Sequence, residues 1–286
     1  MRVFGLDFTS APRRGKPITC AACALADGTL RVEALVALES FEIFENFLGT
    51  PGPWLAGMDF PFGQPRRLCR GLGWPERWAD LARHMGGLEI TEFEHLLADY
   101  RAGRAPGDKH HLRATDRLAS SRSPMMLYGV PVARMFYRGV PLLERAEVSV
   151  LPCRPLDTDR VVVEVYPALV ARRYIGKRSY KNDARVKQTP EREAARRDLI
   201  AGITSGAVAA DYGFELDLPD GLTEEFARDG SADRLDALLC AIQAAWAWTR
   251  RDESYGIPRD ADPLEGWIVD PEMLIAEAEV AAAARR

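Results

Sequence analysis

Five acidic side chains lie within or at the end of strongly apolar stretches of this 286-residue sequence. The first three follow runs that read as buried strands, and the last two begin a long apolar helix: Asp7 after VFGL, Asp59 after WLAGM, Glu164 after VVV, and Asp233 and Asp236 in DRLDALLCAIQAAWAW. A carboxylate removed from water without a partner destabilises a fold, so acids placed repeatedly at the ends of core elements need a compensating charge. The pattern predicts that these acids converge on a cation.

The geometry of an α/β sheet gives this prediction a location. Ligands of open α/β sheets gather beyond the carboxyl ends of the parallel strands, and adjacent strands are about 4.8 Å apart. Asp7, Asp59 and Glu164 are therefore expected near one shared position, and Asp233 and Asp236 could join them from one face of a helix. Crowded carboxylates repel one another unless a cation is bound, and Mg²⁺ or Mn²⁺ is the expected occupant because hard cations prefer oxygen ligands.

Each acid also has a purely structural interpretation. Asp7 and Asp59 could accept hydrogen bonds from the turns that follow them. Glu164 could pair with an arginine of the following helix. Asp233 in a first helical turn is stabilised by the helix dipole whatever its function. Asp236, one turn further in among leucines, is the stronger functional candidate of the two.

The elements that must position these acids are visible in the apolar patterning. Residues 2–8, 17–26 and 29–39 predict a three-stranded antiparallel meander, with an Asp-Gly hairpin turn at residues 27–28. Strands at 54–60 and 160–166 complete a mixed five-stranded sheet in which the first strand is central. Helices are expected at 40–48 with Ser40 as N-cap, at 75–85, 91–102 and 190–206, and at 232–250 with Ser231 as N-cap. The fold class is α/β.

Length and composition favour one globular domain. The chain is 47% hydrophobic and 28% charged, which predicts a single domain over 1–271, with a mainly helical and loop insertion at about 64–158 and a helical tail at 272–286. No run approaches the roughly 18 apolar residues of a membrane span, and Met1 leads directly into a strand, so a cytoplasmic protein is expected. Cys20 and Cys23 should face opposite sides of a strand, which argues against a disulfide or a zinc site.

The charge distribution bears on partners. The net charge of −4 lacks the basic excess typical of proteins that coat duplex nucleic acid. Basic residues nevertheless cluster just after the acidic strand ends, and such a rim around an acidic centre suits a phosphate-bearing substrate, although surface cations are often simply solvated. The candidate substrate-binding residues are Thr9, Ser10, Arg66, Lys181 and Arg185.

Four segments carry a resemblance to a known family: GLDFTSAP at 5–12, GMDFPFGQPR at 57–66, VVEVYPA at 162–168 and DRLDALLCA at 233–241. Over about residues 2–270 the sequence resembles domain-of-unknown-function family 429, which is described as predicted RNase H-like nucleases. The acid on the first strand and the DxxD of the last helix also resemble those of RNase H-like Holliday-junction resolvases. The resemblance implies an RNase H-like fold and metal-dependent phosphodiester hydrolysis. The position of Glu164 on a late strand departs from many such nucleases.

Three functions are compatible with these residues. The first is a metal-dependent nuclease with two-metal hydrolysis, in which Asp7 bridges two ions and Asp59, Glu164 and Asp236 complete their shells. The second is a nucleotide-binding phosphotransferase or ATPase of the actin-like kind, with Thr9 and Ser10 at the phosphate. The third is a non-catalytic nucleic-acid-binding module. We expect the first, with a nucleic acid or nucleotide as substrate and no membrane partner.

Overall fold

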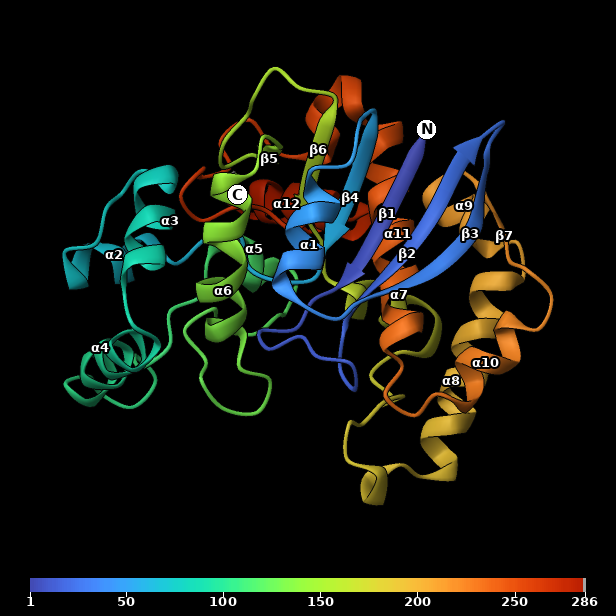
Figure 1. The fold of residues 1–286 in the computed structure, drawn as a ribbon, viewed down its shortest axis with the longest axis horizontal. Helices are drawn as coiled ribbons and strands as arrows, with labels where there is room; N and C mark the ends of the chain where they lie inside the picture. The colour runs from blue at the N-terminus through green and yellow to red at the C-terminus, as the bar shows by residue number, and fades with distance from the viewer. Residues whose placement is uncertain (285–286) are drawn as a thin grey trace.

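A mixed β-sheet with helices on both faces forms the centre of the protein (Figure 1). The computed structural model describes the backbone of residues 1–284 and the side chains of residues 1–278. Within that part of the chain, no helix combines the length and the apolar composition needed to cross a bilayer.

Over residues 1–284 the sheet has seven strands in the order β5-β6-β4-β1-β2-β3-β7. They are β1 (Arg2–Asp7), β2 (Ile18–Ala26), β3 (Thr29–Leu38), β4 (Trp54–Met58), β5 (Ser149–Leu151), β6 (Arg160–Glu164) and β7 (Glu215–Asp217). β1, β2 and β3 are antiparallel, whereas β4 and β6 continue from β1 in parallel. The central place of β1 and the mixed α/β class are confirmed.

The prediction of five strands is wrong. β5 and β7 are edge strands that pair in parallel with β6 and β3. Each has only three residues, too few for an alternation of apolar and polar side chains to stand out in the sequence. β5 also belongs to the stretch 64–158, so the expected insertion contributes one strand to the sheet as well as α2 to α6.

The helices cover the sheet in two layers. They are α1 (Phe41–Leu48), α2 (Arg66–Leu72), α3 (Trp78–Gly87), α4 (Ile90–Ala102), α5 (Ala114–Leu118), α6 (Val132–Arg145), α7 (Pro167–Ile175), α8 (Pro190–Thr204), α9 (Ala207–Tyr212), α10 (Leu222–Arg228), α11 (Asp233–Thr249) and α12 (Pro271–Ala284), with 3₁₀ turns η1 (Arg185–Lys187) and η2 (Arg251–Gly256). α11 packs across β1, β2 and β4 on one face, and α1 and α6 lie on the other (Figure 1). The expected helices are confirmed with ends shifted by a few residues.

Two local predictions about helix starts have different outcomes. Ser40 caps α1, since its hydroxyl accepts a hydrogen bond from the backbone of Ile43 at 3.2 Å. Ser231 does not cap α11: its hydroxyl donates to Asp229, and the residue before the helix is Ala232 in a left-handed conformation. The backbone of the preceding turn, which the sequence pattern does not reveal, therefore sets the start of α11.

Strand alternation divides the apolar core between the two faces. In β1 and β4, Val3 and Leu55 face the α11 side, whereas Leu6 and Met58 face the α1 and α6 side. Cys20 and Cys23 of β2 likewise lie in different core clusters, as predicted. This alternation decides which acids can meet at the sheet's edge.

Two further elements follow their predicted positions. The Asp27-Gly28 turn joins β2 to β3 with φ of 49° and 71°, the pair of positive values that a two-residue hairpin turn matching the strand twist requires. The predicted tail helix begins at Pro271 as α12, and its first turn is anchored by the buried side chain of Met273. Residues 285–286 of that tail lie outside the described residues.

Candidate active site

Asp7 and Asp59 stand side by side at the carboxyl ends of β1 and β4. The two strands are parallel with Leu6 paired to Met58, and the backbone N–H of Asp59 donates to the carbonyl of Leu6 at 3.0 Å. Because alternate residues share a face, both aspartates follow the register of Val3 and Leu55 toward α11. The predicted meeting of these two acids is therefore present in the structure.

Two glycines bring α11 against the same strand ends. A Cβ on Gly5 would lie 2.1 Å from the carbonyl oxygen of Ala237, and one on Gly57 would lie 2.8 Å from that of Cys240. The helix backbone can approach this closely only because both side chains are absent. The approach carries Asp236, in the first turn of α11, toward the two strand-end aspartates.

A repeated tetrapeptide in the sequence marks the two places where α11 approaches the strands, although the apolar pattern alone does not reveal it. The tetrapeptide Gly-x-Asp-Phe occurs twice, at 5–8 and at 57–60. In each copy the glycine lies under the helix, the aspartate follows on the same face two residues later, and the phenylalanine turns to the opposite core. The rings of Phe8 and Phe60 pack there with centroids 4.3 Å apart.

Burial and mutual repulsion raise the pKa of all three acids. Burial raises the pKa of Asp7 well above its ordinary value, and Asp236, Asp233 and Asp59 add to the effect. Burial, with the charges of Asp236 and Glu164, raises the pKa of Asp59 to about 7. Burial also raises the pKa of Asp236. These shifts are the expected response of carboxylates that are buried near one another.

Lys181 supplies the positive charge at this cluster. Its ammonium forms an ion pair with Asp236, whose side chain has no exposed surface, while the Lys181 side chain is 42% exposed. The hydroxyl of Tyr180 donates to the other oxygen of Asp236 at 2.6 Å. Lys181 also opposes the rise in the pKa of Asp7 and Asp59, so its charge acts on all three carboxylates.

Asp233 is held separately. Lys16 donates to both of its carboxylate oxygens, at 2.7 and 2.9 Å, and to Asp183 at 3.1 Å. By contrast, neither Asp7 nor Asp59 accepts a side-chain hydrogen bond or an ion pair from the residues whose side chains are described. The two strand-end carboxylates are therefore available to a ligand, whereas Asp233 is occupied.

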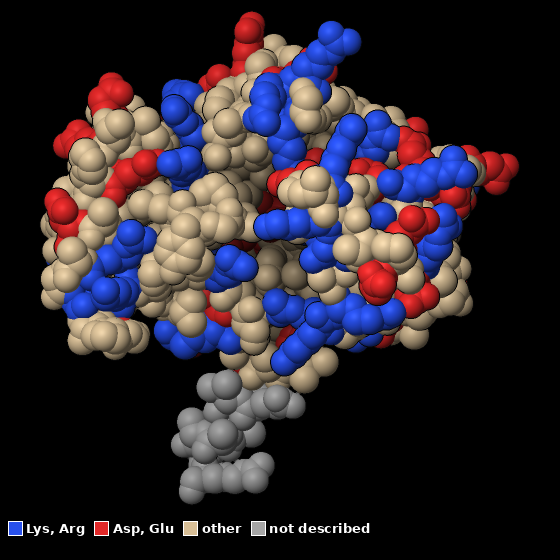
Figure 2. Space-filling view, turned by 90° about the horizontal axis from the view of Figure 1, so that it is seen from below, with Lys and Arg blue, Asp and Glu red and all other residues tan. Residues whose placement is uncertain are grey.

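A cavity of about 520 Å³ lies over these groups, lined in part by Asp7, Asp59, Lys16, Lys181 and Arg122. It opens on the face at the carboxyl ends of β1 and β4, where Figure 2 shows Lys and Arg side chains gathered around a hollow. The acid cluster thus faces solvent through a basic border.

The candidate substrate-binding residues divide into two groups. Thr9, Ser10 and Lys181 line the cavity. Arg66 does not, since it forms hydrogen bonds of 2.6 Å to both oxygens of Asp262 and pairs with Glu76. Arg185 is exposed in η1 and is also not among the lining residues.

One family model matches most of this chain. The model described as protein of unknown function (DUF429) matches residues 5–262. The chain belongs to the DUF429 family. No curated protein and no solved structure matched it. The matched range of this DUF429 protein includes both Gly-x-Asp-Phe segments, Lys181 and α11.

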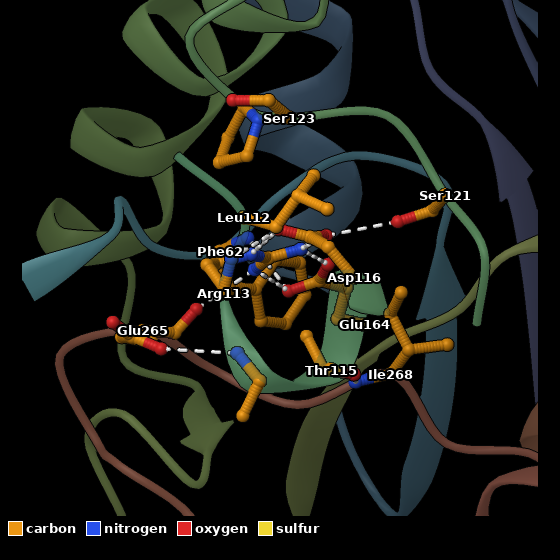
Figure 3. Close-up of polar contacts among 12 residues, drawn as sticks. Phe62, Leu112, Arg113, Thr115, Asp116, Ser121, Ser123, Glu164, Glu265 and Ile268 are labelled. Atoms are coloured by element: carbon orange, nitrogen blue, oxygen red, sulfur yellow. Dashed lines mark hydrogen bonds and ion pairs between the residues drawn. The ribbon is translucent and has the colours of Figure 1, made fainter. Parts of the chain in front are cut away.

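Glu164 does not join the acid cluster of this DUF429 protein. It pairs in register with Met58, so its side chain points to the face opposite Asp59. There Arg113 donates to both of its oxygens, at 2.5 and 2.8 Å, and the backbone N–H of Phe62 donates at 2.9 Å (Figure 3). Glu164 is therefore paired with an arginine, as its structural interpretation predicts. That arginine immediately precedes α5, however, and does not lie in the helix after β6.

Arg113 joins three parts of the chain. It is 1% exposed and also pairs with Asp116 and with the carbonyl of Glu265 (Figure 3). Burial would lower the pKa of its guanidinium, but Asp116 and Glu164 raise that pKa well above the usual value. The network connects the 64–158 stretch and the C-terminal loop to the end of β6, and no sequence signal marked Arg113.

The acid cluster fits a divalent metal ion by donor type. Hard cations bind carboxylate oxygens. Two of the three carboxylates, Asp7 and Asp59, have no side-chain hydrogen bond or ion pair among residues 1–278. Among the side chains of residues 1–278, however, no three His, Cys, Asp or Glu groups already form a metal site. In the DUF429 protein the third carboxylate, Asp236, is bound by Lys181 and by the hydroxyl of Tyr180, so a metal ion that uses Asp236 competes with the ammonium of Lys181.

Proposed function

We propose that this protein hydrolyses phosphodiester bonds in nucleic acid with a divalent cation, Mg²⁺ or Mn²⁺, held by Asp7, Asp59 and Asp236. The observation that carries the proposal is the pair of unpartnered aspartates at adjacent strand ends, facing a basic-bordered cavity beside a third buried aspartate. Glu164 is omitted from the ligand set because its side chain points to the opposite face of the sheet. Asp233 is omitted because, of the two strand-end acids, its charge acts on the pKa of Asp7 alone, whereas the charge of Asp236 acts on the pKa of both Asp7 and Asp59.

The residues around the cluster would divide the work of hydrolysis. The bound ion would supply Lewis-acid activation of the phosphate and of the attacking water. Asp7 and Asp59 must lose their protons to bind it, and burial opposes this by raising the pKa of both, that of Asp59 to about 7. Lys181, released from Asp236, lies within the cavity and can neutralise a phosphate oxygen, and the hydroxyls of Thr9 and Ser10 can donate to it. The water oxygen forms one P–O bond, one P–O ester bond breaks, and the leaving oxygen takes up a proton.

The strand arrangement supports an RNase H-like assignment. An antiparallel β1-β2-β3 meander extended by parallel β4 and β6 is the sheet expected from the family resemblance, and β5 and β7 add only short edges to it. In that resemblance the acid at the end of β1 and the acids of the closing helix would correspond to those of RNase H-like enzymes. We therefore propose that the hydrolase is an RNase H-like nuclease.

The test is metal-dependent cleavage of an end-labelled single-stranded oligonucleotide. Wild type should cut it with Mn²⁺ and not with EDTA. Asp7→Asn should reduce the rate by more than about 100-fold, because even a change in a residue that only hydrogen-bonds a metal ligand reduces activity by about 10- to 100-fold. Asp217→Asn is the matched control, since it neutralises an exposed aspartate paired with Arg31 at the far edge of the sheet. Cleavage that persists in Asp7→Asn or in EDTA contradicts the proposal.

One observation favours a second candidate. Thr9 and Ser10 follow Asp7 and line the same cavity, which is where an actin-like phosphotransferase would contact a nucleotide phosphate. ATP hydrolysis that is lost in Asp7→Asn, with no strand cleavage, would favour this function. Binding of the oligonucleotide without either reaction would favour a non-catalytic module.

A further inference from the structure

A second cavity adjoins the acid cluster. It has a volume of about 220 Å³ and shares with the first cavity the residues Asp59, Arg122, Val130, Met135 and Lys181. Asp59 and Lys181 therefore stand at the junction between the two spaces. A substrate with its phosphate at the acid cluster has this second space directly beside that phosphate.

The walls of the second cavity are mostly apolar. They come from the turn after β4, the start of α6, and the segment that leads from β6 into α7, and include Pro61, Val132, Met135, Val165, Tyr166 and Ala168. Away from the junction with the first cavity, the charged groups at its wall are Arg113, Asp116 and Glu164, and the two carboxylates both pair with Arg113. Tyr180 is committed to Asp236 through its hydroxyl. The cavity thus offers apolar and aromatic surface next to a phosphate site.

We propose that this cavity receives one unstacked nucleobase of the strand whose phosphate lies at Asp59 and Lys181. The proposal rests on the function proposed above and specifies its substrate as single-stranded or locally unpaired nucleic acid. A volume of about 220 Å³ is below the roughly 300–1,000 Å³ of pockets for drug-sized ligands, and suits one ring system. A base stacked inside a duplex cannot enter such a space, whereas an extruded or single-stranded base can.

Charge at the junction supports the same occupant. Arg122 lines both cavities and, within residues 1–278, has no ion pair. Together with Lys181 it places positive charge where the backbone phosphate passes between the two spaces. Tyr166 is half-buried in the wall, with the guanidinium of Arg172 5.3 Å from the centre of its ring, and offers an aromatic surface for the base.

Ala168→Trp tests the proposal by filling the cavity. Ala168 is half-buried in the first turn of α7 and lines the space. The matched control is Ala194→Trp, which adds the same bulk at an exposed position on α8. Val132→Phe fills the cavity from the opposite wall, at the start of α6, and serves if the first variant fails to fold.

The readout is a ratio of cleavage rates on two single strands with Mn²⁺. One strand carries all its bases, and the other is abasic at the residue next to the cut. Wild type and Ala194→Trp should prefer the intact strand by roughly 5- to 150-fold, the range expected for stacking of one base. In Ala168→Trp or Val132→Phe this ratio should fall close to one. A ratio that the filled variants retain, or a duplex cut as fast as a single strand, overturns the proposal.

A binding measurement separates this inference from the proposed hydrolysis. If no strand is cut, the nuclease proposal fails, and the cavity is judged from the fluorescence of 2-aminopurine placed at the same residue of a single strand. A fluorescence change on binding to wild type that is absent in the filled variants supports the base-binding cavity. An equal change in all variants, or none in wild type, rejects it.

Discussion

Removal of the Lys181 charge should tighten metal binding, although Lys181 is also expected to contact substrate. Its ammonium pairs with the fully buried Asp236 and opposes the rise in the pKa of Asp7 and Asp59. Burial alone would lower the pKa of Lys181, but Asp236, Tyr180 and Asp7 raise it well above the ordinary value. The lysine is thus charged at neutral pH and competes with a metal ion for the same oxygens.

The size of the effect follows from this competition. Two unit charges 4 Å apart interact by about 4 kcal/mol at an effective dielectric constant of about 20. Because the Lys181 side chain is 42% exposed, solvent screens most of that energy, and an interaction of about 1–2 kcal/mol remains. Lys181→Met should therefore bind Mn²⁺ about 5- to 30-fold more tightly than wild type. Asp236→Asn should bind it more weakly.

Isothermal titration of Mn²⁺ at pH 8 and low ionic strength measures the affinities directly. Lys187→Met is the matched control, since it removes the same charge from an exposed position in η1. Under the same conditions Lys181→Met should lose strand cleavage, so tighter metal binding and lower activity should appear in one variant. A dissociation constant for Lys181→Met equal to or higher than that of Lys187→Met would refute the reasoning.

Three further outcomes are expected. The pKa of Asp59 is raised from 3.8 to about 7, so between these pH values the folded protein keeps a proton that the unfolded chain releases. In EDTA the free energy of unfolding should therefore fall as pH rises from about 4 to 7, by at most about 4 kcal/mol. Urea unfolding should show that Asp59→Asn flattens this decline. Arg113→Met removes the ion-pair partner of the buried carboxylates of Asp116 and Glu164, so it should lower the free energy of unfolding by about 3–5 kcal/mol. The control Arg197→Met, at an exposed ion pair, should lower it by less than about 1 kcal/mol. Gly5→Ala places a Cβ 2.1 Å from the α11 backbone, so it should destabilise the fold by about 1–3 kcal/mol or more and weaken Mn²⁺ binding. The control Gly15→Ala, whose Cβ would have nothing within 4 Å, should change neither quantity. Equal denaturation midpoints for the two alanine variants would contradict the packing argument.

The longer elements could be predicted from the sequence because their signals are local. The Asp27-Gly28 hairpin, the apolar runs of β1 and β6 and the cap at Ser40 each depend on neighbouring residues. The two missed strands have three residues each and exist only through pairing with β6 and β3. Pairing of that kind is set by tertiary packing, which no local pattern contains.

The sequence predicts those parts of the candidate site that lie at the ends of strands and at the start of a helix. Asp7, Asp59 and Asp236 follow directly from that reasoning. Glu164 does not, because its side depends on the register between β4 and β6, and a shift of one residue reverses the face. Arg113, its partner, is 51 residues away in the chain, and only the folded structure brings the two together.

The positive charge of Lys181 also affects the order in which the acid cluster can bind metal and substrate. Three neighbouring carboxylates repel, and Lys181 offsets that repulsion without any bound ion, so the fold can form before metal is present. The same ion pair must open for metal to reach Asp236, which weakens metal binding until another anion accepts the lysine. A substrate phosphate in the cavity is such an anion. Metal and substrate should therefore strengthen each other's binding, by a coupling that disappears in Lys181→Met when Mn²⁺ is titrated with and without an uncleavable phosphorothioate strand.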